Sequence, residues 1–317
     1  MRFTDLVRAI SARAMFASHG VLAVWSVHMV FNGLWPFYLM AGAAPLLLET
    51  LLCITLNGGR EWGRFCPGVA CYLIWVLPTL WTLEQVALYE RMSKGHNCSL
   101  FTHEDIKELT ANQWVETSFA LETTRQIILL VIIISRWLMP RGHMTHDQLS
   151  QLLLAYTGVA ADITDFRAAL RLRLSQVRCD EVLNNAMLAL WSLSLLQFTV
   201  RITPSATISH QTGLLSGYLG GDPNREFQNE LIAAVSSIAM QDCPFLVART
   251  TLMVVYNIYQ PSIIFFMFKN VVGIIIMVYR LTIVNKGIFR REERKIEQLL
   301  LARDLIISHH YRFRSFA

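Results

Sequence analysis

Charged residues are scarce in this sequence. Asp, Glu, Lys and Arg together make up 16% of the 317 residues, whereas an ordinary soluble domain carries about 25%. Hydrophobic residues reach 54%, and the mean hydropathy is +0.40. This composition argues against a soluble globular protein and favours one that places most of its surface in lipid.

Cysteine and histidine motifs are also missing. The six cysteines form no CxxC pair and no disulfide framework, so we interpret them as small apolar packing residues. His103-Glu104-Asp105 lacks the second histidine of an HExxH zinc site. Because no nucleophile or metal constellation stands out, we predict no catalytic residue, no metal and no cofactor, and we do not expect an enzyme.

Apolar blocks of about 18 to 25 residues fill most of the chain. At 1.5 Å per residue, one such block crosses the roughly 30 Å hydrocarbon core of a bilayer as a helix. We predict an all-α fold: a polytopic membrane helical bundle of about eight transmembrane helices over residues 1–285, then a basic cytoplasmic tail over 286–317. The blocks cover approximately residues 14–31, 34–56, 65–88, 114–137, 149–161, 182–200, 227–259 and 262–284. The stretch 227–259 is too long for one perpendicular span, so we expect a kink near Met240.

The short block 149–161 leaves two topologies open. If it crosses, both termini are cytoplasmic and most loops obey the positive-inside rule, but four arginines lie outside: Arg167, Arg171, Arg173 and Arg178. If it is re-entrant, these arginines stay inside, but 227–259 must then cross twice. We prefer eight crossings, in the plasma membrane or a membrane of the secretory pathway.

The tail and one loop suggest further features. After residue 285 the chain carries eight basic and four acidic residues and no zinc or RNA-binding signature. We predict an amphipathic surface helix that contacts anionic lipid, and no nucleic acid partner. Asn97-Cys98-Ser99 is the only N-glycosylation sequon. Its polar loop lies on the side opposite the tail, so we predict glycosylation of Asn97.

Seven charged residues interrupt the apolar blocks: Glu49, Glu84, Glu122, Arg125, Asp242, Arg249 and Lys269. Each costs at least roughly 2.5 kcal/mol at mid-bilayer, which favours positions facing the bundle interior or water. Glu122 and Arg125 are i,i+3 neighbours and are predicted to pair. Glu49, Glu84 and Lys269 lie within about two turns of their block ends, so we expect them to reach the interface by snorkelling.

Asp242, Pro244 and Arg249 form the most informative group. Pro244 interrupts a long apolar block, and a broken helix at membrane depth is tolerated where it is buried in protein or lines a wet cavity. Asp242 and Arg249 lie on one helix face, about 10 Å apart along the axis, so a residue on another helix could bridge them. These charges, with Glu122 and Arg125, either line a path for an ion, proton or substrate or fix helix register as ion pairs.

Two stretches, 65–84 (FCPGVACYLIWVLPTLWTLE) and 241–249 (QDCPFLVAR), resemble segments of the transmembrane protein 26 family. The similarity extends from the first apolar block to about Val284 and does not include the tail. It implies a multi-pass membrane protein, usually with eight helices, and it implies no particular reaction, ligand or cofactor.

Two functional hypotheses follow. In the first, a non-enzymatic membrane protein acts through interactions, as a receptor-like or scaffold component with the basic tail as its cytoplasmic contact surface. In the second, a small transporter or channel uses Asp242, Arg249, Glu122 and Arg125. A flux assay in proteoliposomes separates the two, because only the second predicts flux.

Overall fold

The computed structural model describes residues 3–31, 34–59, 65–93, 111–140, 146–171, 180–200, 231–232 and 234–314. Within these ranges the chain is almost entirely helical, and its only extended pairing is an isolated bridge between Phe65 and Val200. The prediction of an all-α fold is therefore confirmed. Asn97 lies outside the described residues, so its glycosylation stays a prediction.

The helices follow one another in the order α1 (Phe3–Phe31), η1 (Trp35–Gly42), α2 (Ala43–Asn57), α3 (Pro67–Ser93), α5 (Ala111–Leu138), α6 (His146–Arg171), α8 (Glu181–Leu196), η2 (Gln197–Thr199), η3 (Ile238–Asp242), α10 (Cys243–Val254) and α11 (Pro261–Arg314). The local sequence explains some of their ends. Gly58 follows α2 with a φ of 58°, in the left-handed region that glycine adopts readily. Asp180 begins α8 by accepting the backbone N–H of Leu183.

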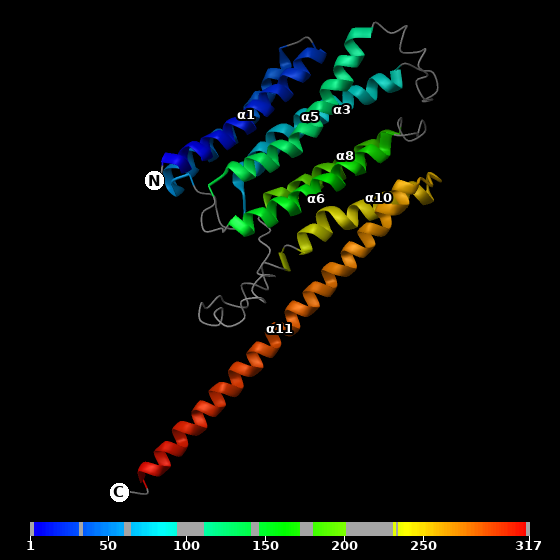
Figure 1. Ribbon diagram of the computed structural model, residues 1–317. Coiled ribbons are helices and arrows are strands. Elements are labelled where there is room, and N and C mark those ends of the chain that lie inside the picture. The colour runs from blue at the N-terminus through cyan, green and yellow to red at the C-terminus, as the bar shows by residue number, and fades with distance from the viewer. Residues whose placement is uncertain are drawn as a thin grey trace.

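The helices pack side by side into a bundle from which α11 extends (Figure 1). Helix α1 packs against α5 and α3, α3 contacts α8, and α6 contacts both α5 and α8. The segment η3 lies against α8 and α11, and α10 packs on α11. Elements from the second half of the chain therefore meet around α6 and α8.

Large buried side chains fill the space between these helices. Trp75 is 2% exposed and lies between two glycines, Gly20 and Gly42. A Cβ added at either glycine would lie 2.5 Å from a ring atom of Trp75, closer than carbon atoms can approach. On the other side of the bundle, the rings of Phe166 and Phe245 stack with centroids 4.0 Å apart. Glycines and aromatic rings thus set how closely α1, η1 and α3 approach one another.

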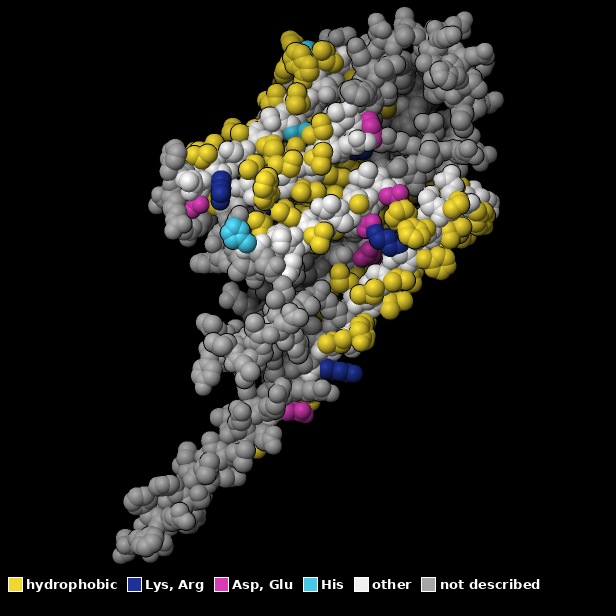
Figure 2. Space-filling model, in the orientation of Figure 1, with side chains coloured by type: hydrophobic (Ala, Val, Ile, Leu, Met, Phe, Trp, Pro, Cys, Tyr) yellow, Lys and Arg dark blue, Asp and Glu magenta, His cyan; other side chains and the backbone are white. Residues whose placement is uncertain are grey.

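Much of the outer surface is apolar, as a lipid-facing surface must be. Figure 2 shows hydrophobic side chains over the bundle and over the adjoining part of α11. Five segments are long and apolar enough to span a membrane: Thr4–Phe31, Trp35–Asn57, Pro67–Leu88, Glu181–Thr199 and Pro261–Ile283. Helices α5, α6 and α10 are not among them, so the expected count of eight spans is not established.

Helices α6 and α11 continue well past the C-terminal ends of their apolar blocks. The block 149–161 belongs to α6, which continues through Asp162 and Asp165 to Arg171. Helix α11 continues past residue 285 to Arg314 without a break, so the tail and the last apolar block form one helix of 54 residues. Hydropathy marks where the apolar surface ends, whereas backbone hydrogen bonding decides where the helix ends.

Candidate functional site

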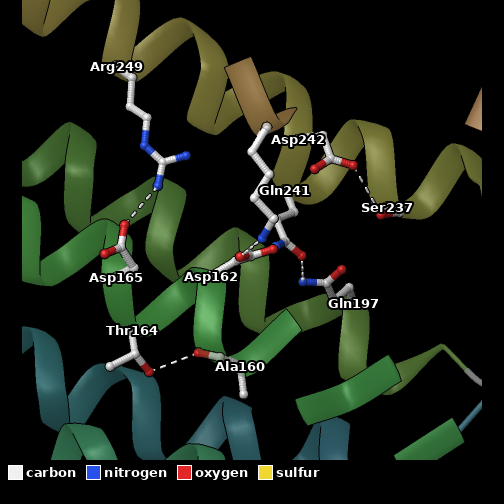
Figure 3. A network of polar contacts seen from close by, with 10 residues as sticks. Ala160, Asp162, Thr164, Asp165, Gln197, Ser237, Gln241, Asp242 and Arg249 are labelled. Carbon is white, nitrogen blue, oxygen red and sulfur yellow. Dashed lines mark hydrogen bonds and ion pairs between the residues drawn. The ribbon is translucent and has the colours of Figure 1, made fainter. Parts of the chain in front are cut away.

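Polar side chains from five helical elements meet where α6, α8 and the C-terminal helices pack together (Figure 3). The set, called the polar cluster below, consists of Asp162 and Asp165 from α6, Gln197 at the end of α8, Ser237, Gln241 and Asp242 around η3, Arg249 from α10 and Lys269 from α11. Asp162 and Asp165 are i,i+3 on α6, so both lie on one side of that helix. The cluster holds three carboxylates and two cationic groups.

Both basic residues of the polar cluster pair with α6. Lys269 forms an ion pair with Asp162, and Arg249 Nη2 lies 3.5 Å from Asp165 Oδ2. The expected bridge between Asp242 and Arg249 is therefore wrong in one respect: α6 supplies the partner of Arg249, but that partner does not reach Asp242. The partners are 84 and 107 residues apart in the sequence, so helical spacing could not predict either pair.

A chain of hydrogen bonds crosses the cluster through two amides. Gln197 Nε2 donates to Gln241 Oε1 at 2.7 Å, and Gln241 Nε2 donates to Asp162 Oδ2 at 3.2 Å. Gln197 and Gln241 are each 2% exposed. Asp162 thus accepts from Gln241 with one oxygen and pairs with Lys269 through the other, which compensates its charge.

Asp242 is the exception within the cluster. Its Oδ2 accepts a hydrogen bond from Ser237 Oγ at 3.3 Å, and within the described residues no Lys, Arg or His nitrogen lies within the 4.0 Å of an ion pair. The side chain is half-buried. Its Oδ1 would lie 3.8 Å from a Cβ added at Gly273, so α11 approaches the carboxylate with a glycine.

The backbone at Asp242 is a π-helix rather than a break. Ile238–Asp242 forms the wide turn η3, and Pro244 occupies the first turn of α10 immediately after it. Proline cannot donate the hydrogen bond of a regular helix, and a single π-turn accommodates the disturbed pattern. The helix runs on from residue 234 to Val254, so the irregularity expected around Pro244 takes the form of a π-turn and does not interrupt the helix.

Arg249 is held by aromatic rings as well as by Asp165. The residue is 2% exposed, and its Cζ lies 5.7 Å from the centroids of Phe166 and Phe245 and 5.1 Å from that of Phe266. Such distances give favourable cation–π contacts. Its Nε and Nη1 have no hydrogen-bond partner within the described chain. The guanidinium is thus a fixed positive charge beside the carboxylates of α6.

A second group of buried charges lies in the N-terminal half. Arg125 forms an ion pair with Glu84 of α3 and lies 3.5 Å from Glu122, so the predicted Glu122–Arg125 pair is confirmed. Arg13 binds Glu49 through Nη2 at 2.8 Å and Nε at 3.0 Å. Glu49 is 8% and Glu84 4% exposed, so snorkelling was the wrong prediction for both. Each finds an arginine on another helix at its own depth.

His19 and Tyr72 belong to a further buried network, in which each hydrogen bond joins two helices. His19 bonds Tyr72 Oη through Nδ1 at 2.7 Å and the Thr124 carbonyl through Nε2 at 3.1 Å. Both ring nitrogens are thereby used between α1, α3 and α5. Across the described residues, no group of three or more His, Cys, Asp and Glu side chains has the geometry to hold a metal ion.

Outside the five segments that are long and apolar enough to span a membrane, Asp180 links the start of α8 to the residues before α11. Its Oδ2 accepts a hydrogen bond from Tyr256 Oη at 2.7 Å. The bond from Tyr256, together with the backbone N–H of Leu183, lowers the pKa of Asp180 below its ordinary value. The same contact raises the pKa of Tyr256.

An all-helical bundle with apolar outer faces and buried ion pairs defines a polytopic α-helical membrane protein. A family model described as transmembrane protein 26 matches residues 3–280, and the chain belongs to that family. The resemblance found in the sequence is thereby confirmed, and the match, like that resemblance, does not include the tail. No solved structure matches the chain.

Proposed function

We propose that this membrane protein acts without catalysis through interactions, as a receptor-like or scaffold component, and that the part of α11 beyond residue 285 is its contact element. The observation that carries the proposal is the continuity of α11 from Pro261 to Arg314. At 1.5 Å per residue, the part after residue 285 extends about 40 Å, and Figure 1 shows it reaching well beyond the other helices.

The surface of this extension supports a contact role. Phe289 is 64% and Leu300 46% exposed. Eleven residues correspond to about three helical turns, so these two positions lie on the same side of α11. The surrounding sequence is rich in Lys and Arg, which supports a cytoplasmic side close to anionic lipid, with both termini cytoplasmic.

Photo-crosslinking in cells tests the proposal. A photoreactive amino acid is introduced at Phe289, at Leu300 and, as a control within the apolar span, at Ile276, which is 57% exposed. The proposal expects protein adducts at the first two positions and lipid adducts at Ile276. Lipid adducts at all three positions would show that the extension contacts only the bilayer.

A small transporter or channel is the second candidate. The specific observation in its favour is Asp242, a half-buried carboxylate beside a π-turn that forms no ion pair with any residue the structure describes. Turns of this kind are frequent at functional sites. Proteoliposomes that hold the purified protein would show ion or proton flux, and Asp242→Asn would abolish it while the protein still inserts. Flux that survives Asp242→Asn would remove this carboxylate from the path.

A further inference from the structure

The charges of the polar cluster do not balance. Asp165 pairs with Arg249 and Asp162 with Lys269, so Asp242 is the carboxylate of the cluster that forms no ion pair with another described residue. An isolated ionised carboxylate in a poorly solvated site is unfavourable, and a bound cation or a proton commonly neutralises it.

Buried polar atoms around the cluster point independently to bound water, the medium through which a carboxylate exchanges a proton. Gln197 Oε1, Arg249 Nε and Nη1, and Asn270 Nδ2 are buried without a hydrogen-bond partner within the described chain. Each of the three residues is 2% exposed. Asn270 precedes Gly273 by three positions on α11 and so shares the helix face that approaches Asp242. Native proteins normally satisfy such groups, often with water. In Figure 3, Arg249 points from α10 toward the carboxylates of α6.

We propose that the polar cluster is a proton-binding site whose titrating group is the carboxylate of Asp242. A metal ion fits the geometry less well, because hard cations take six or more oxygen ligands. Ser237 Oγ is the only oxygen that the described residues place in hydrogen-bond contact with Asp242, and these residues include no metal-holding group of acidic, His or Cys side chains.

The groups around Asp242 define how it should titrate. Ser237 stabilises the carboxylate form by donating a hydrogen bond, and Lys269 from α11 favours it by charge. Asp162 from α6 opposes ionisation of Asp242 by charge. Arg249 from α10 is already paired with Asp165, and η2, directly after α8, contributes the neutral Gln197. With Asp242 ionised, the polar cluster has three carboxylates and two cations. Protonation of Asp242 therefore brings the net charge of the cluster to zero.

A hydrophobic carbodiimide measures this protonation directly. Dicyclohexylcarbodiimide adds to a protonated carboxyl group: the acid proton moves to a reagent nitrogen, the carboxyl oxygen bonds the central carbon, and rearrangement gives a stable N-acylurea. No atom leaves, so the modified peptide gains the whole reagent mass. The experiment uses the intact wild-type protein in nanodiscs, so its first readout depends on no variant.

The expected result is labelling of Asp242 that falls about tenfold per pH unit above its midpoint. Asp165→Asn, the matched control that removes a neighbouring carboxylate, should keep the label on Asp242 and move the midpoint to lower pH. Lys269→Met should move it to higher pH, because the cluster loses a positive charge. Asp242→Asn should lose the label while purifying as a monodisperse protein.

Three results would overturn the proposal. No label on Asp242 between about pH 5 and pH 9, or pH-independent labelling, would show that it does not exchange a proton in this range. A label on Asp162 or Asp165 instead would assign the proton to another carboxylate. Suppression of labelling by Na⁺ relative to choline at constant pH would identify a metal-ion site. Labelling reports protonation and not movement across the bilayer, so this site and the transport function can fail separately.

Discussion

Replacing Glu49 by alanine distinguishes a buried ion pair from a snorkelling side chain. Glu49 accepts two hydrogen bonds from Arg13, and the two residues are 8% and 3% exposed. Removing one partner of a buried pair costs about 3–5 kcal/mol, because the other charge stays buried. We expect the lower end, about 3 kcal/mol, since Arg13 Nη1 still donates to the Ala9 carbonyl at 3.2 Å.

A loss of this size lowers the melting temperature by roughly 5–10 °C. The measurement is thermal unfolding of the purified protein in detergent. Leu48→Ala provides the control, because Leu48 neighbours Glu49 in sequence but is 59% exposed. Glu49→Gln should lose less than alanine, and the double change Arg13→Met with Glu49→Leu should recover much of the stability, since it removes both charges. If the Glu49→Ala variant has a melting temperature no lower than that of Leu48→Ala, the ion pair contributes little to stability. That result would favour the snorkelling interpretation.

Three further predictions follow from other parts of the chain. Gly20→Ala should destabilise the protein by about 1–3 kcal/mol because its Cβ would overlap the Trp75 ring, whereas Gly158→Ala, with open space around it, should be neutral or stabilising in the same thermal assay. Asp180→Asn should lower stability at neutral pH; because folding lowers the pKa of Asp180 below 3.8, the difference from wild type should shrink as the pH falls from that value through the folded pKa, as thermal melts against pH would show. Glycosidase treatment should shift the mobility of the wild type and not of Asn97→Gln, and accessibility of this loop on the same side as the C-terminus would refute the topology.

The sequence predicted interactions within one helix better than those between helices. The pairing of Glu122 with Arg125 followed from their i,i+3 spacing alone and is confirmed. Glu84, the closer partner of Arg125, lies 41 residues away in sequence. Whether a charge near a block end snorkels or pairs depends on a partner helix that presents the opposite charge at the same depth. The hydropathy of one block does not show at what depth another helix places the opposite charge.

The same reasoning explains why the carboxylates of α6 were not recognised as part of a site. Asp162 and Asp165 end an apolar block, and in the sequence they indicate the end of a span. In the structure α6 continues through them to Arg171, and Lys269 and Arg249 from the C-terminal helices compensate their charges. Their i,i+3 spacing was the available signal for a shared helix face. Combined with the basic residues already noted at 249 and 269, that face would have suggested two cross-helix pairs. It would also have left Asp242 without a counter-charge among the residues of the polar cluster, which is the feature that gives the cluster its proposed capacity to bind a proton.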